Sequence, residues 1–155
     1  MRAARAVPCL VGLPYDASSS FLRGAAEAPP LIRQALHSDA GNWWTETLID
    51  LAQPGTLHDA GDVALPANAV RALPLIEQAV ARIIANGQRP IALGGDHLVT
   101  YPVLRAIASA LGPVTILHVD AHPDLYDEYD GDRLSHACPF ARIMEEGLAR
   151  RLVQV

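Results

Sequence analysis

The sequence predicts an α/β fold with a mostly parallel sheet, and three observations lead to this prediction. Short apolar segments typical of buried strands alternate with longer segments that have helical apolar periodicity. Loops rich in Pro, Gly, Ser and Asp separate several of these segments. Two apolar segments end in runs of His and Asp, and such strand ends share one crevice in an open parallel sheet.

The expected elements follow one another without an intervening linker. Strands are predicted at residues 7–13, 47–51, 89–93 and 114–119, with the start of another at 151–155, and helices at 29–37, 68–86 and 98–111. Residues 14–24 and 53–66 are expected to be loops. Asp96 is placed to cap the helix from residue 98, with Pro102 in or near its first turn. We therefore expect residues 1–155 to form a single domain.

The second polar run, Asp-Ala-His-Pro-Asp at residues 120–124, follows a β-branched strand. Alternate side chains of an extended backbone share a face, so Asp120, His122 and Asp124 are expected to converge on one small volume. Pro123 favours an extended conformation at His122, which would continue the alternation beyond the strand.

The first polar run, Gly-Gly-Asp-His at residues 94–97, follows the strand predicted just before it. Gly94 and Gly95 would let the backbone turn sharply, and His97 would then face outward at the carboxyl end of that strand. The two runs therefore point to the same crevice.

Carboxylates and imidazoles without thiolates suit a divalent ion such as manganese, with iron, cobalt and zinc as competitors. A carboxylate at the centre of such a cluster can bridge two ions, and Asp120 is the natural bridge. Two metals about 3.5 Å apart can generate hydroxide at neutral pH. His118 lies within the apolar strand, and we interpret it as a core histidine rather than a ligand.

The residues resemble the ureohydrolases, the family of arginases, agmatinases and related metal-dependent hydrolases. The resemblance rests on the two polar runs and on residues 19–24, 28–33 and 135–147, and it is nearest to plant-type arginases. It implies a three-layer sandwich and the hydrolysis of a guanidino substrate, arginine or agmatine, to urea and an amine. The attacking group would be a hydroxide that bridges two Mn²⁺ ions.

The resemblance also implies roles for individual residues. His97 and Asp124 would bind one manganese ion, His122 the other, and Asp120 would bridge both. His136 would match the family's proton-shuttling histidine, because an imidazole that titrates near neutrality can pass a proton to a leaving amine. Tyr126 would lie where family members often contact substrate.

Family members continue through a third, aspartate-rich motif that supplies two further ligands, and nothing in this sequence matches it. The resemblance therefore implies an amino-terminal half of a catalytic domain, with the fold truncated about halfway. The chain alone is expected to bind at most one metal ion tightly and to have little or no activity. Two alternatives stay open: a formimidoylglutamase-like amidine hydrolase, and a non-catalytic metal-binding fragment that needs a partner chain.

Composition is typical of a cytoplasmic globular protein, with 50% hydrophobic residues and a net charge of -5. The acidic balance argues against nucleic-acid binding and mildly favours a cationic substrate. Two cysteines give no disulfide framework or zinc spacing, and the first residues of the sequence are expected to be neither a signal peptide nor a membrane anchor. A homo-oligomer is expected for the whole protein.

Overall fold

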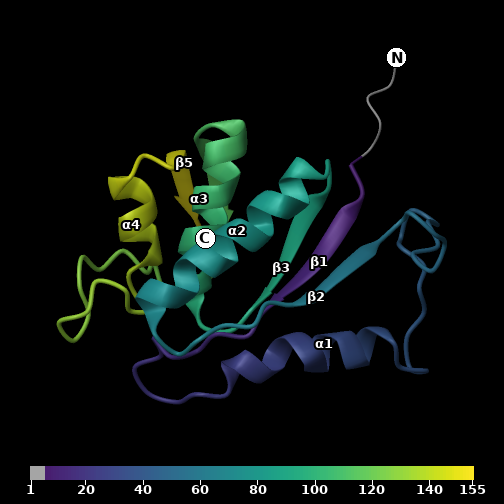
Figure 1. Ribbon diagram of the computed structural model, residues 1–155, viewed down its shortest axis with the longest axis horizontal. Helices are drawn as coiled ribbons and strands as arrows, with labels where there is room; N and C mark the ends of the chain where they lie inside the picture. Colours follow the sequence, from purple (N-terminus) through teal and green to yellow (C-terminus); the bar gives the residue numbers. More distant parts are fainter. Residues whose placement is uncertain (1–5) are drawn as a thin grey trace.

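The computed structural model describes residues 6–155, in which strands and helices alternate (Figure 1). In chain order the elements are β1 (Pro8–Leu13), η1 (Ala25–Glu27), α1 (Ala28–Leu36), β2 (His58–Asp62), α2 (Ala69–Ala85), β3 (Arg89–Gly94), η2 (His97–Val99), α3 (Thr100–Leu111), β4 (Val114–His118), α4 (Pro139–Glu145) and β5 (Ala149–Gln154), where η denotes a short 3-10 helix. β1 pairs in parallel with β2 and β3, and β4 pairs in parallel with β5. The α/β fold class predicted from the sequence is confirmed.

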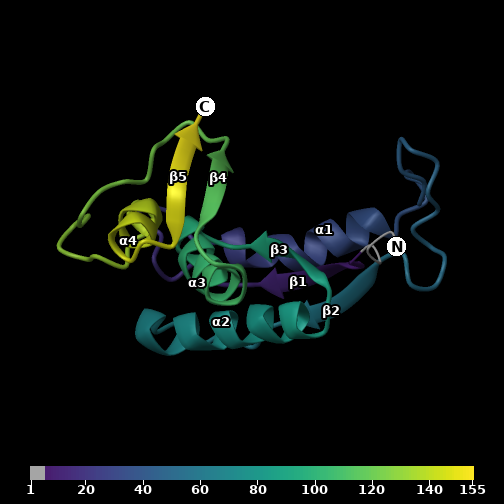
Figure 2. The same cartoon turned by 90° about the horizontal axis from the view of Figure 1, so that it is seen from above.

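The first three strands form one sheet in the order β2-β1-β3, and helices cover both of its faces. Figure 2 shows α1 on one side of β1 and β3 and α2 on the other, which gives three layers. Apolar residues of β1 and α2 are buried against each other, including Cys9, Val11, Leu13, Leu73, Ile76 and Val80. This packing fixes the direction in which the first sheet presents its strand ends.

The last two strands form a separate sheet, β4-β5, with α3 and α4 nearby (Figure 2). Within residues 6–155, β3 and β4 each have one edge without a hydrogen-bonded strand partner. Apolar side chains on or beside these strands stay exposed: Ile91 at 44%, Leu117 at 68% and Val119 at 74%. The sheet expected from the sequence is therefore present in two parts.

Two helical starts follow the signals in the sequence. The side chain of Asn68 accepts from the backbone N–H of Arg71 at 3.1 Å and caps α2. Asp96 caps η2 in the same way, and η2 leads directly into α3. Pro102 is the third residue of α3, where its missing N–H costs no hydrogen bond.

No helix in the described part of the chain is long and apolar enough to cross a membrane.

The strand expected at residues 47–51 is wrong. The chain there forms turns with one isolated bridge between Trp44 and Asp50, and Leu48 has φ 59°. The apolar residues Leu48 and Ile49 are exposed, so the β-branched and apolar composition of this segment does not reflect burial in a sheet.

The second strand of the sheet is instead β2, which lies within the segment expected to be a loop. Its residues, His-Asp-Ala-Gly-Asp, have little intrinsic preference for a strand. Tertiary contacts supply the preference: β2 pairs with β1, and Arg33 from α1 forms ion pairs with Asp59 and Asp62 and donates to the carbonyl oxygen of Gly61.

Candidate functional site

A cleft of about 940 Å³ opens beyond the carboxyl ends of β3 and β4. Its polar lining includes Asp96, His97, Asp120, His122, Asp124, Tyr126, Tyr129 and His136. Every residue that the sequence marked as a metal ligand, proton shuttle or substrate contact therefore lies on the wall of this one cavity. The two halves of the sheet meet there through their loops rather than through strand pairing.

The turn after β3 is held by its backbone. Asp96 N–H donates to the carbonyl oxygen of Tyr15 at 2.7 Å, and a Cβ on Gly95 would lie 1.9 Å from that oxygen. Glycine is thus needed for a close approach, not for a positive φ. The Asp96 carboxylate accepts from the N–H groups of Leu98 and Ser18, and burial raises its pKa. This rigid turn positions His97.

His97 lies between two carboxylates. Its Nδ1 contacts Asp124 Oδ2 directly and lies 4.0 Å from Asp120 Oδ2. Phe140 packs edge-on against the ring, with 5.4 Å between centroids. The Asp124 side chain is 11% exposed, whereas that of Asp120 is 36% exposed. One imidazole nitrogen and two carboxylate oxygens therefore face a common small volume.

The loop after β4 brings Asp120 and Asp124 together by bending, not by the extended alternation expected from the sequence. β4 ends at His118, the backbone bends over residues 120–122, and Asp124 has φ 47°. Asp120 Oδ1 accepts from the N–H of His122 at 2.9 Å, and this hydrogen bond lowers the pKa of Asp120. The His122 side chain is 79% exposed, with Nδ1 3.7 Å from Asp120 Oδ1.

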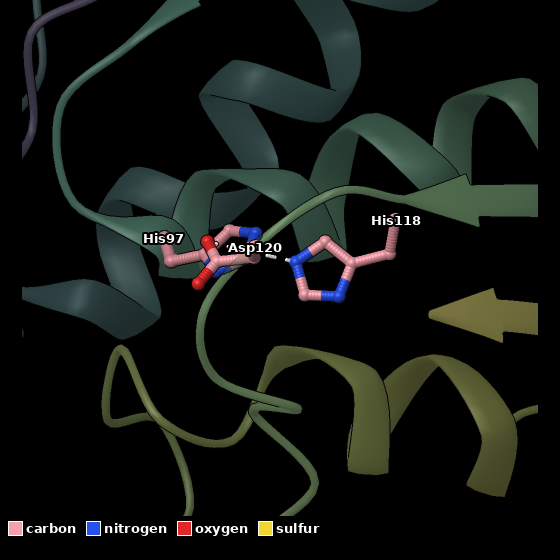
Figure 3. A group of neighbouring side chains, drawn as sticks. All are labelled: His97, His118 and Asp120. Atoms are coloured by element: carbon pink, nitrogen blue, oxygen red, sulfur yellow. Dashed lines mark ion pairs between the residues drawn. The ribbon is translucent and has the colours of Figure 1, made fainter. Parts of the chain in front are cut away.

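His118, which we interpreted from the sequence as a core histidine, is buried and also lies beside this cluster. The residue is 8% exposed and its ring packs against Phe140, yet Nε2 lies 3.7 Å from Asp120 Oδ2. One potential ligand atom each from His97, His118 and Asp120 lies within 4.8 Å of the others (Figure 3).

His136 lies on the wall of the cleft, and its orientation is fixed by the loop after β1. Its Nδ1 lies 3.0 Å from the carbonyl oxygen of Ser18, and its backbone N–H donates to the same oxygen at 3.2 Å. Since a carbonyl oxygen only accepts, Nδ1 carries a proton and Nε2 is the nitrogen free to exchange one. Tyr129 meets the His136 ring edge-on at 6.0 Å, and Tyr126 lies beside Tyr129.

Arg142 of α4 anchors the loop that carries both tyrosines. It is 6% exposed and donates to the carbonyl oxygens of Asp127 and Arg133 at 2.7 and 3.3 Å. It also donates to the Asp127 carboxylate at 2.6 Å, which holds the pKa of that group below its usual value. Sequence reasoning did not identify Arg142, because its partners are brought together only by the tertiary fold.

The residues present fit a divalent cation. Two carboxylates and at least one imidazole converge at the base of the cleft, and no thiolate is among them. This donor set suits manganese, iron, cobalt or zinc and does not choose between them.

Comparisons with known proteins show which family and fold the chain is similar to. The profile described as "Arginase family" matches residues 7–155. The chain is 43% identical to "Arginase 2, chloroplastic/mitochondrial" of Arabidopsis thaliana, over 98% of this chain and 46% of that protein. Among solved structures, the arginase from Medicago truncatula superposes with a TM-score of 0.89 at 42% identity, covering 97% of this chain and 50% of that one. Formimidoylglutamase from Bacillus subtilis subsp. subtilis str. 168 gives 0.83 at 29% identity, covering 99% and 49%.

The chain spans about half the length of the curated relatives it matches. The name of the Arabidopsis relative assigns that protein to organelles, and the cytoplasmic location expected from composition stays a prediction for this chain.

Proposed function

The chain belongs to the arginase family, and on that premise we propose that the protein hydrolyses a guanidino substrate to urea and an amine with the help of bound divalent metal ions. One observation carries the proposal. The His97, Asp120 and Asp124 cluster and the His136 ring line the same cleft, so a metal site and a proton carrier face one bound substrate.

The proposed ligands are the four residues named from the sequence. His97 and Asp124 would hold one ion, His122 the other, and Asp120 would bridge them. Bound divalent ions supply a hydroxide nucleophile at neutral pH. Manganese is the proposed metal on the resemblance to the family, and the donor set is compatible with it. The exposed ring of His122 is compatible with this role because its Nδ1 already lies near Asp120.

His136 is proposed to move the proton that the departing amine requires. The Ser18 carbonyl oxygen holds the Nδ1 proton in place, so only Nε2 changes its protonation state during transfer. The hydrogen bond also orients the ring, which spares the entropy of arranging it at each turnover.

A cationic substrate such as arginine or agmatine suits the acidic balance of the chain, whose net charge is -5. Tyr126, 57% exposed on the wall, is the proposed substrate contact. A formimidoylglutamase-like activity is the second candidate, because this chain also superposes well on a protein of that name.

The test uses the full-length protein, stripped of metal and reloaded with Mn²⁺, and a panel of arginine, agmatine, guanidino acids and formimidoylglutamate. We expect urea release from one guanidino substrate and its loss on chelation. Asp120→Asn should reduce the rate at least a hundredfold. The control, Asp39→Asn, changes an exposed carboxylate on another part of the surface and should leave the rate unchanged. Ammonia or formamide released from the formimino compound, without urea from any guanidino substrate, would favour the second candidate.

A further inference from the structure

His118 is held in one orientation by its surroundings. It is the last residue of β4, and its ring packs against the buried Phe140 with 4.2 Å between centroids. β5 runs beside β4 and pairs His118 with Gln154 in register. In Figure 3 the ring lies beside the Asp120 carboxylate, with its edge directed at it.

Gln154 determines which ring nitrogen of His118 carries the proton. The Gln154 Nε2 lies 2.6 Å from the carbonyl oxygen of Pro123 and 3.0 Å from His118 Nδ1. A backbone carbonyl can only accept, so the amide group at this position is the NH₂ group, which has two protons to donate. One goes to Pro123 and the other to His118 Nδ1. Nδ1 is therefore the acceptor, and the neutral ring carries its proton on Nε2.

This Nε2 is a buried donor whose hydrogen bond is not made. It has no hydrogen-bond partner among the described residues, and Asp120 Oδ2 lies 3.7 Å away. A buried polar group without a partner destabilises the fold, so a small adjustment that closes this gap is favourable. A ligand role would require the opposite tautomer, with Gln154 turned so that its oxygen meets the Pro123 oxygen.

We propose that Gln154 and His118 form a positioning pair, in which Gln154 sets the tautomer of His118 and His118 donates from Nε2 to Asp120 to orient this carboxylate for metal binding. His118 is then not a metal ligand, although its nitrogen lies near the cluster. The second hydrogen bond of Gln154 holds Pro123 and so restrains the loop that carries His122 and Asp124. The part that concerns metal binding rests on the proposed function, whereas the tautomer does not.

The first test is the protonation of His118 in wild-type, full-length protein, measured by ¹⁵N NMR of the imidazole nitrogens without metal and with diamagnetic Zn²⁺. We expect a proton on Nε2 and none on Nδ1 in both states. A proton on Nδ1 in the metal-free protein, or loss of the Nε2 proton when Zn²⁺ binds, would overturn the proposal. This measurement needs no activity, so it separates a failure of the pair from a failure of the proposed enzyme.

The second test measures Mn²⁺ affinity by calorimetry. His118→Phe keeps the packing against Phe140 but removes the donor, and should weaken binding about 10- to 100-fold. His118→Gln places an N–H near the position of Nε2 and should recover most of this loss. Thr115→Val on the exposed face of β4 is the control and should leave affinity unchanged. Equal weakening in the Phe and Gln variants, or none in either, contradicts a donor role.

Discussion

At the residue scale, the site depends on a few contacts that leave no room for other side chains. Gly95 is the clearest case, since the carbonyl oxygen of Tyr15 occupies the space that a Cβ would take. The contact joins the loop after β1 to the turn after β3 and so sets the distance between His97 and the residues of the first loop. Sequence reasoning correctly gave a turn here, but not the reason for glycine.

Gly95→Ala should therefore destabilise the protein by about 1–3 kcal/mol, because the backbone of Tyr15 or of residue 95 must move to make room for the added Cβ. The measurement is the free energy of unfolding from urea denaturation. Gly41→Ala is the matched control: a Cβ there meets nothing within 4 Å, so stability should be unchanged or slightly higher. A Gly95 variant as stable as the control would show that the turn can relax.

Asp127 gives a prediction for pH. Arg142 donates to its carboxylate and lowers its pKa, so the folded state binds a proton less readily than the unfolded state. The stability that this provides is present above the unfolded pKa, about 4, and is lost as pH falls through the lower folded pKa. In urea unfolding, Asp127→Asn should be less stable than wild type at pH 6, and the difference should shrink towards about pH 2.

Asp130→Asn provides the matched control for this titration. Asp130 lies in the same loop and has no ion pair within the described residues. Since this substitution removes no ion pair, the Asp130→Asn variant should lack the loss of stability expected for Asp127→Asn at pH 6. If both variants behave alike, the pairing with Arg142 does not account for the acid sensitivity of the loop.

At the element scale, β2 shows how a segment without strand propensity becomes a strand. Arg33 binds both aspartates of β2 and the Gly61 carbonyl, which links α1 to the edge of the sheet. The Asp62 carboxylate also covers Gly12 of β1, where a Cβ would lie 1.7 Å from Oδ1. The strand is thus specified by its partners rather than by its own residues.

Arg33→Met should loosen β2 and lower the free energy of unfolding by about 1–2 kcal/mol, a value reduced by the partial exposure of both aspartates. The substitution should increase the rate of amide hydrogen exchange more in residues 58–62 than in β3. Arg71→Met, which changes an exposed arginine of α2, should affect neither measurement. Unchanged exchange in β2 would mean that pairing with β1 is sufficient.

At the scale of the whole molecule, the two sheets leave unpaired edges and apolar side chains between β3 and β4, and the chain spans about half the length of its relatives. Open, apolar strand edges favour self-association. The proposed metal site is also open on the side where Asp120 and His122 are exposed. These features bear on how the 155 residues behave when they are produced alone.

The isolated 155-residue chain should self-associate, bind at most one Mn²⁺ ion tightly and release little or no urea. Sedimentation, metal analysis and a urea assay check these points, with the full-length protein as the control. A monodisperse chain with two bound ions and robust turnover would contradict the prediction. Whether the full-length protein forms the expected homo-oligomer is read from the same sedimentation experiment.

The sequence by itself determined the α/β class, most helix and strand positions, and four polar residues of the cleft, His97, Asp120, His122 and Asp124, since apolar periodicity and strand-end position are local signals. The resemblance to the family added His136 and Tyr126. Only the tertiary structure decided the place of β2, the bend that joins Asp120 to Asp124, and the inclusion of His118. Each of these depends on partners distant in sequence: Arg33 for β2, Phe140 for Asp124 and His118, and Gln154 for the ring proton. Such contacts form only when the chain folds, so residue spacing does not encode them.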